Sequence, residues 1–283
     1  MLTPLRYPGG KAKLGAWLAY LLRSNNIDGT YVEAYAGGAG AAIYLLSNGY
    51  VKSIKINDLD VAIYSFWMSV THNSSSFIKK IIETPVTIEE RLKQKEIYEN
   101  PFRYTELEVG FATFFLNRTN RSGIITGGVI GGKNQTGNYK IDARYTKENL
   151  VQRVKNIGDM RDKIAIHCED ALSFLKRLDV GSNSLINLDP PYYNKGSQLY
   201  SSFYEHGDHI SISNYVHDID TPVIVTYDNC EEIQEIYEGH DSLTFNMIYS
   251  SHLGRPVAKE LLVYRNIKID PLPFTSKQIG PIK

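Results

Sequence analysis

Residues 30–58 read TYVEAYAGGAGAAIYLLSNGYVKSIKIND, and this stretch decides the fold class. Strand-forming residues come first, a turn of small residues follows, and an apolar helical run leads to a second strand that ends in Asp58. This order predicts a strand–helix–strand unit with parallel strands, because parallel neighbours need a crossover connection. Repetition of such units builds an α/β sheet.

Strand-like patterns recur along the chain, and several precede helical or turn patterns. They occupy residues 163–167, 184–188, 223–226 and 261–264. The alternation predicts a mostly parallel, doubly wound, Rossmann-like sheet. Helical runs and a glycine-rich segment interrupt it between residues 61 and 160. We therefore predict a discontinuous catalytic domain at 1–60 and 161–270, an inserted, mainly helical subdomain at 61–160, and a C-terminal tail at 271–283.

The charge of the chain is balanced overall, with 31 basic and 31 acidic residues. This balance excludes a protein that coats nucleic acid through charge alone, because such binding needs many Lys and Arg contacts to phosphates. Residues 113–155 differ, since they contain eight Lys or Arg and only two acids. An ordinary solvated face would explain this excess. We favour a local nucleic-acid surface.

Composition also bounds the class of protein. A content of 42% hydrophobic and 22% charged residues is typical of a globular fold. No apolar run approaches the roughly 20 residues that span a bilayer, and the N-terminal residues do not resemble a secretory signal. Cys168 and Cys230 stand apart without nearby His ligands, so neither a disulfide framework nor a zinc site is indicated. We expect a soluble protein with no membrane partner.

The turn AGGAG at residues 36–40 follows the first predicted strand. Glycine there allows a sharp turn and the close approach of a ligand to the backbone. A tight strand-to-helix connection without a ligand would look similar. Asp58 ends the next strand about 20 residues later, where α/β folds commonly bind ribose hydroxyls. Together the turn and the acid indicate a cofactor that contains adenosine.

The sharpest signal is LINLDPPYYN, residues 185–194, in which an apolar strand delivers Asp189-Pro190-Pro191-Tyr192 to its carboxyl end. Ligands of open α/β sheets bind at that edge. Consecutive prolines stiffen the turn and remove two backbone donors, which leaves carbonyl acceptors. The Asp189 carboxylate and the Pro190 carbonyl can bind the two hydrogens of a conjugated amine and favour its attack on a methyl sulfonium.

Aromatic residues accompany this motif. Tyr192, with Tyr193 beside it, offers a stacking face for a base, and a base inside a duplex must flip out to reach a methyl donor. The alternative is a simple Asp-Pro-Pro turn with core tyrosines. The upstream glycine turn argues against that alternative, because both elements are predicted at the same edge of the sheet.

Four elements, in this order, resemble the Dam-type (D12 class) family of adenine-N6 DNA methyltransferases. They are Tyr7-Pro8-Gly9-Gly10-Lys11, Tyr35-Ala36-Gly37-Gly38, the insertion at 61–160, and Asp189-Pro190-Pro191-Tyr192. The resemblance covers essentially the whole chain. It implies a Rossmann-like methyltransferase fold with an inserted DNA-recognition subdomain, S-adenosylmethionine as cofactor, and methylation of a flipped-out adenine in double-stranded DNA.

The same resemblance implies site residues. Catalysis falls to Asp189, Pro190, Pro191 and Tyr192, and no metal is expected. The residues expected to bind the cofactor are Tyr7, Lys11, Glu33, Tyr35, Ala36, Gly37, Gly38, Asp58, Asp170 and Asp189. The residues expected to contact DNA are Arg6, Arg118, Asn120, Arg121, Ser122, Ile124, Lys140 and Arg144. Ile124 is a candidate for apolar contact with a thymine methyl group.

The recognition hairpin departs from the pattern of members that read GATC. Those members carry an aromatic-Asn pair in the hairpin and an arginine just beyond it, whereas Arg121-Ser122 and Thr126 stand here. The resemblance therefore extends to methyl transfer but not to GATC specificity. The resemblance implies a cytoplasmic location in a bacterium, with the protein encoded by the bacterium or by a phage. A cognate restriction enzyme is a candidate partner.

Two other functions stay open at this point. The Asp-Pro-Pro-Tyr geometry also suits cytosine N4 or an RNA adenine, while protein glutamine methylation usually carries Asn in place of Asp189. A catalytically silent DNA-binding relative is the second alternative, and intact Lys11, Asp58 and Asp189 argue against it.

Several residues outside these motifs also receive an interpretation. His206 and His209 lack a third ligand, so we expect loop or DNA-edge residues rather than a metal site. Tyr200, Phe203 and Tyr204 either close over the flipped base or pack beneath the loop. Lys259 and Glu260 are expected to face solvent.

Overall fold

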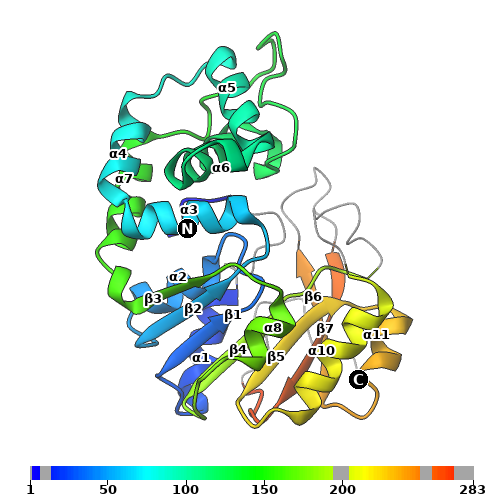
Figure 1. Cartoon of the computed structure of the whole chain (residues 1–283). Coiled ribbons are helices and arrows are strands. Elements are labelled where there is room, and N and C mark those ends of the chain that lie inside the picture. Colours follow the sequence, from blue (N-terminus) through cyan, green and yellow to red (C-terminus); the bar gives the residue numbers. More distant parts are fainter. Residues whose placement is uncertain (1, 7–13, 194–203, 249–256, 271–283) are drawn as a thin grey trace.

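The structure, a computed structural model, describes residues 2–6, 14–193, 204–248 and 257–270 (Figure 1). The predicted tail at 271–283 lies outside the described residues, as do Tyr7 and Lys11.

Seven strands within the described residues form one sheet in the order β3-β2-β1-β4-β5-β7-β6. Their bounds are β1 (Thr30–Glu33), β2 (Ser53–Asn57), β3 (Ile164–His167), β4 (Ser184–Leu188), β5 (Val223–Asp228), β6 (Ser242–Ile248) and β7 (Val257–Arg265). β1 to β5 run parallel, and β7 is antiparallel to both β5 and β6. The predicted mostly parallel, doubly wound, Rossmann-like sheet is confirmed.

Strand β6 was not predicted from the sequence, although the other strands were. Its residues alternate between the apolar Leu243 and Phe245 and the polar Thr244 and Asn246. Such a period of two is typical of a half-buried antiparallel strand. The parallel strands read as continuous apolar runs instead, and all five residues of β4 are buried.

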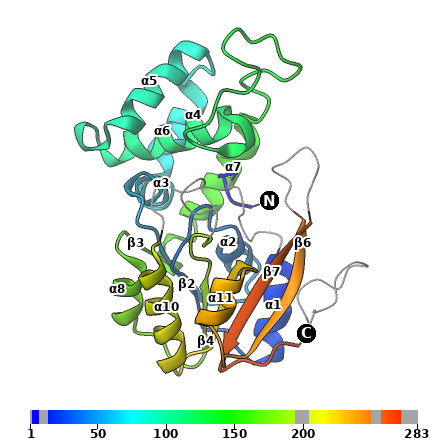
Figure 2. The same cartoon turned by 90° about the vertical axis from the view of Figure 1, so that its right-hand side faces the viewer.

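Helices cover both faces of the sheet, as Figures 1 and 2 show. The helices of one face are α1 (Gly15–Ser24) and α2 (Gly40–Ser47), and those of the other are α8 (Ala171–Lys176), α10 (His206–Asp218) and α11 (Glu231–Ile236). Successive residues of a strand enter opposite layers: Tyr31 packs into the first core and Val32 into the second. Burial on both faces explains the apolar strands.

The insertion consists of helices that stand over the edge of the sheet (Figures 1 and 2). They are α3 (Val61–His72), α4 (Ser74–Glu83), α5 (Ile88–Glu99), α6 (Glu106–Thr119) and α7 (Lys147–Gly158). Polar caps begin three of them, because Asp60, Thr87 and Thr105 each accept a hydrogen bond from a backbone amide of the first turn. The mainly helical character predicted for residues 61–160 is seen here.

Aromatic side chains form the core of the insertion. Phe66 stacks on Phe114 with ring centroids 6.3 Å apart, and Phe77 meets both edge-on. Gly110 lets α6 approach α3, since a Cβ there would lie 2.4 Å from the Ser65 carbonyl oxygen. This core continues into the one beneath α1 and α2. The division at residues 61 and 160 therefore stays a prediction.

Candidate active site and nucleic-acid interface

The glycine turn and the Asp-Pro-Pro-Tyr segment follow neighbouring parallel strands. In the register of β1 and β4, Glu33 is opposite Asn187, and Glu33 is also opposite Ile56 of β2. The carboxyl ends of the three strands therefore meet at one edge, where open α/β sheets bind their ligands. This edge unites segments that are more than 100 residues apart in the sequence.

The glycine turn is held from several directions. Gly37 has a φ of 46°, in the left-handed region that favours glycine, and its N–H donates to Asp58 Oδ2 at 2.7 Å. Its carbonyl accepts from the Trp67 indole Nε1 at 2.9 Å, and the Gly38 carbonyl accepts from Thr3 Oγ1 at 2.7 Å. The turn is thus fixed by β2, by α3 of the insertion and by the N-terminal segment.

Asp58, at the end of β2, is hydrogen-bonded to the glycine turn at the end of β1. Besides the bond to Gly37, its Oδ1 accepts the Asp60 amide at 3.0 Å. Burial raises the pKa of this carboxyl to about 6, while the backbone hydrogen bonds oppose that rise. The position fits the predicted cofactor contact, and that contact stays a prediction.

Glu33 lies deeper than Asp58, at 6% exposure on β1. Its Oε1 accepts the Ala42 amide in the first turn of α2 at 3.1 Å. Burial raises the pKa of Glu33 to about 8, and the Asp189 carboxylate acts in the same direction, so the group carries a proton at neutral pH. Glu33 therefore supports the turn from beneath, beside the catalytic candidate Asp189.

The Asp-Pro-Pro-Tyr segment is held by strands β5 and β7. Thr226 Oγ1 donates to Asp189 Oδ1 at 2.9 Å. The Tyr193 amide donates to Asp228 Oδ1 at 3.1 Å, and the Tyr192 hydroxyl donates to the Glu260 carboxylate at 3.1 Å. Residues of a neighbouring parallel strand and of the antiparallel strand next to it thus hold the segment.

The expectation that Glu260 faces solvent was wrong. Glu260 is 1% exposed, because β7 lies inside the sheet between β5 and β6 rather than at an edge. Lys259 is exposed as expected.

An aromatic cluster lies next to the Asp-Pro-Pro-Tyr segment. The Tyr35 and Tyr204 hydroxyls are 2.8 Å apart, and the rings meet edge-on with centroids 5.9 Å apart. Tyr193 and Tyr204 both contact the His209 ring, with centroid distances of 5.2 and 5.5 Å. Tyr204 therefore packs among these side chains in this structure, whereas Tyr200 and Phe203 lie outside the described residues.

The two histidines begin helix α10 and do not lie in a loop, which corrects our expectation. His206 is exposed, and its Nδ1 is 3.1 Å from the Tyr193 hydroxyl. His209 is 1% exposed, and its Nδ1 is 2.9 Å from the Tyr227 hydroxyl. Burial lowers the pKa of His209 to about 4, so it is neutral at physiological pH. It is a core residue rather than a DNA-edge residue.

Asp170 follows β3 at the same side of the sheet as Asp58. It is exposed and caps α8, where its Oδ1 accepts the Ser173 amide at 2.9 Å. The other oxygen of a capping carboxylate can still accept from a ligand. Its predicted contact with the cofactor adenine stays a prediction.

Two residues expected to contact DNA are buried within the insertion. Arg118 is 6% exposed and its guanidinium donates to the Pro4 carbonyl, while burial lowers its pKa to about 9. Asn120 is fully buried: its Oδ1 accepts from Arg91 Nε at 2.7 Å and its Nδ2 donates to the Ile125 carbonyl at 2.6 Å. Direct DNA contact does not fit either position. Arg118 holds the N-terminal segment instead, and Asn120 holds the loop that follows α6.

The remaining DNA candidates lie around this loop. Arg121 is exposed, although its Nε donates to the Val129 carbonyl at 3.3 Å, and Ile124 is 43% exposed. Ser122, with a φ of 57°, turns the chain between them. Lys140 and Arg144 are also exposed: the first donates to the Gln135 and Gly137 carbonyls, and the second lies over the Tyr139 ring at 5.6 Å.

The N-terminal segment packs against the same loop. The Arg6 amide donates to Asn117 Oδ1 at 2.8 Å, and Asn117 Nδ2 returns a bond to the Arg6 carbonyl at 3.0 Å. Gly123 has a φ of 78°, and a Cβ there would lie 1.9 Å from the Arg6 carbonyl oxygen. Burial and the charge of Arg144 lower the pKa of Arg6. Arg6 is thus adjacent to the loop after α6 despite 111 residues of separation from Asn117.

Sequence reasoning missed the residues that hold these segments. Arg91 donates to Asn120 and also to the Gly127 carbonyl at 3.0 Å, yet it lies in a charged helix whose pattern shows nothing unusual. Thr226, Asp228 and Glu260 likewise belong to strands without a motif. One signal was available for Glu260, because an acid within the strand VAKELLVYR is unusual for an apolar run.

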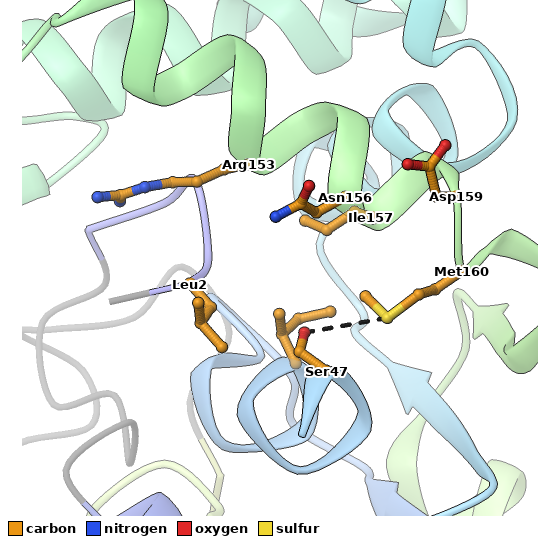
Figure 3. A pocket seen from close by; sticks show the side chains of 8 residues that line it. Leu2, Ser47, Arg153, Asn156, Ile157, Asp159 and Met160 are labelled. Atoms are coloured by element: carbon orange, nitrogen blue, oxygen red, sulfur yellow. Dashed lines mark hydrogen bonds between the residues drawn. The ribbon is translucent and has the colours of Figure 1, made fainter. Parts of the chain in front are cut away.

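A hollow between α2 and α7 is separate from the strand ends (Figure 3). It is lined by Leu2, Ile43, Ser47, Arg153, Asn156, Ile157, Asp159 and Met160. The Ser47 hydroxyl donates weakly to the Met160 sulfur at 3.9 Å. None of the predicted site residues lines this hollow. No helix among the described residues is long and apolar enough to cross a membrane.

Two solved structures align with most of this chain at low similarity. A Pyrococcus horikoshii protein described as an RNA methyltransferase aligns with a TM-score of 0.43 and 14% identity over 92% of this chain and 84% of that chain. The rRNA methyltransferase AviRa of Streptomyces viridochromogenes aligns with a TM-score of 0.40 and 14% identity over 92% of this chain and 87% of that chain. These values are too low to support the fold assignment, which rests on the sheet order.

Sequence comparison is decisive for the family. No curated protein sequence matches the chain at a significant level. The family model described as D12 class N6 adenine-specific DNA methyltransferase matches residues 7–253, which include the glycine turn, the insertion and the Asp-Pro-Pro-Tyr segment. The chain therefore belongs to the D12 class of N6 adenine-specific DNA methyltransferases.

Proposed function

We propose that this adenine-specific DNA methyltransferase recognises a specific sequence in double-stranded DNA and methylates N6 of an adenine that it flips out of the duplex. The observation that carries the proposal is the placement of Asp189 at the end of β4, beside the glycine turn at the end of β1. A methyl donor at the turn and an amine at Asp189 would then be neighbours.

The residues at this edge fit S-adenosylmethionine, the methyl donor that the family implies. The ribose hydroxyls of the donor need acceptors, and its adenine needs apolar contact. Its amino acid group carries an ammonium and a carboxylate, and the carboxylate needs backbone donors. Asp58 and Asp170 supply carboxylate oxygens, Tyr35 an aromatic face, and Ala36 to Gly38 a close backbone. When bound there, the donor supplies an electrophilic methyl group on sulfur.

The protein's own part of the reaction is to hold and polarise the amine. The Asp189 carboxylate and the Pro190 carbonyl accept the two N6 hydrogens, which draws the nitrogen lone pair out of conjugation with the ring. The Tyr192 face stacks on the flipped base. Asp189 keeps one oxygen on Thr226, so its orientation is set before the base arrives.

Recognition of DNA is assigned to the side chains around the loop after α6 that are at least partly exposed. Arg6, Arg121, Ser122, Ile124, Lys140 and Arg144 remain the candidates after Arg118 and Asn120 are set aside. Arg121 and Ile124 are the exposed residues at the two ends of one turn and suit contact with base edges, whereas Lys140 and Arg144 suit phosphates.

The test is sequencing that detects modified bases in DNA from cells that express the wild-type protein, the Asp189→Ala variant, or the matched Asp179→Ala variant. Asp179 is an exposed acid before β4, so its replacement controls for loss of charge. We expect N6-methyladenine in one short motif with the wild type and Asp179→Ala, and none with Asp189→Ala. N4-methylcytosine, or methylated RNA with unmodified DNA, would contradict the proposal.

A second measurement tests the DNA surface. Arg121→Ala is expected to weaken binding or relax recognition by about 1–3 kcal/mol if Arg121 reads a base. Lys176→Ala, on helix α8, is the control and should not change binding. Equal affinity and selectivity of Arg121→Ala and wild type would remove Arg121 from the interface.

A further inference from the structure

The Tyr192 side chain is hydrogen-bonded to the carboxylate of Glu260, which lies outside the Asp-Pro-Pro-Tyr motif. Its hydroxyl lies 3.1 Å from Glu260 Oε1 and 3.3 Å from Oε2. Glu260 is 1% exposed on β7, and the residues that follow it, Leu261 and Leu262, are buried and apolar. A buried acid in an apolar strand is costly unless hydrogen bonds compensate its desolvation. The tyrosine hydroxyl supplies one such bond.

A second carboxylate faces Glu260 across the strands. In the antiparallel register of β5 and β7, Asp228 is the partner of Glu260. Like charges directly opposite each other destabilise a sheet. Here the two acids bind consecutive residues of the catalytic segment, since Asp228 accepts the Tyr193 amide at 3.1 Å and Glu260 accepts the Tyr192 hydroxyl. Each acid therefore holds one residue of the segment that follows β4.

The bonds also connect two functions of the segment. Thr226, two residues before Asp228 on β5, holds Asp189, while Glu260 on the adjoining strand holds Tyr192. Because β5 and β7 are hydrogen-bonded to each other, they fix the carboxylate and the aromatic ring relative to one another. A free tyrosine would rotate about its side-chain bonds, and a rotated ring would present the base at the wrong angle to Asp189.

We propose that Glu260 is a positioning residue, which orients the Tyr192 ring so that the flipped adenine stacks in line with Asp189. This inference rests on the proposed function, because it assumes that a base stacks on Tyr192. Glu260 acts through Tyr192 and need not touch the base. It sets the rate of methyl transfer and leaves binding of the methyl donor unchanged.

The test compares purified wild type with Glu260→Ala, Glu260→Gln, Tyr192→Phe and the double variant Tyr192→Phe/Glu260→Ala. Glu238→Ala, an exposed acid, is the matched control. Single-turnover methylation of a duplex with the motif found for the wild type gives the rate. Equilibrium binding of S-adenosylmethionine gives the donor Kd, and a thermal melt reports folding of each variant.

We expect Glu260→Ala and Tyr192→Phe each to slow the single-turnover rate by about tenfold. The double variant should be no slower than the slower single variant, because both changes remove the same bond. Glu260→Gln keeps an acceptor oxygen and should stay within about threefold of wild type. The donor Kd should change less than about twofold in every variant.

The inference is overturned if Glu260→Ala methylates at the wild-type rate, or if the losses of the single variants multiply in the double variant. If Glu260→Ala does not fold, Tyr192→Phe and Glu260→Gln decide the question. A wild-type rate for Tyr192→Phe, or a tenfold loss for Glu260→Gln, also overturns the inference. Wild-type protein that binds the donor but transfers no methyl group to DNA would instead refute the proposed function.

Discussion

Replacement of Thr226 by valine removes one hydroxyl from the support of Asp189 and leaves the shape of the side chain nearly unchanged. Thr226 is 1% exposed on β5, and its Oγ1 donates to Asp189 Oδ1 across 2.9 Å. A hydrogen bond to a charged group contributes about 1.5–3 kcal/mol, and about 1.4 kcal/mol changes a rate tenfold. If the bond holds Asp189 in its reactive orientation, Thr226→Val slows single-turnover methyl transfer by roughly 10- to 150-fold.

The assay mixes excess enzyme with a duplex that carries the target motif and follows methyl incorporation with time. Thr226→Ser is the control, because it keeps the hydroxyl and should retain most of the rate. The Kd for S-adenosylmethionine and the melting temperature should stay near wild type, since Thr226 is buried and its hydroxyl bonds to Asp189 rather than to the glycine turn. A wild-type rate for Thr226→Val, or an equal loss with Thr226→Ser, would refute the role assigned to this bond.

Gly110→Ala should lower the free energy of unfolding by about 1–3 kcal/mol in a denaturant titration, because its Cβ would press on α3; Gly207→Ala, with open space around its Cβ, should not. Affinity for S-adenosylmethionine should fall about tenfold from pH 7 to pH 5 as Asp58 loses its charge through a pKa of about 6. Because the pKa of Asp58 is raised in the folded state, this group favours folding at the lower pH, so its titration does not cause a loss of affinity through unfolding. An affinity that does not change with pH, or the same pH dependence in Asp58→Asn, would contradict the prediction. Arg91→Lys should weaken DNA binding about fivefold without changing donor affinity, since one ammonium cannot hold both Asn120 and the Gly127 carbonyl; equal DNA affinity for wild type and Arg91→Lys would contradict it.

The sequence by itself determined the parallel core of the sheet and the choice of Asp189–Tyr192 as the candidate catalytic segment. Apolar runs buried on both faces and the glycine turn are local patterns, and local patterns can be read without knowing what they pack against. The Asp-Pro-Pro-Tyr segment is equally local, because its chemistry lies in four consecutive residues. Strand β6 was not predicted because the alternation of a half-buried strand of seven residues is a weak sequence signal.

Only the tertiary structure decided which polar residues are exposed and which are buried in hydrogen bonds that hold the protein together. Arg118 and Asn120 are close to Arg121 in the sequence, yet the first two are buried and the third is exposed. The reason is that α6 ends at Thr119 and the chain turns into a loop after Asn120. Glu260 looked like a surface acid until the position of β7 inside the sheet placed it against Tyr192. Long-range hydrogen bonds depend on chain segments far apart in the sequence, so a local pattern does not specify their partners.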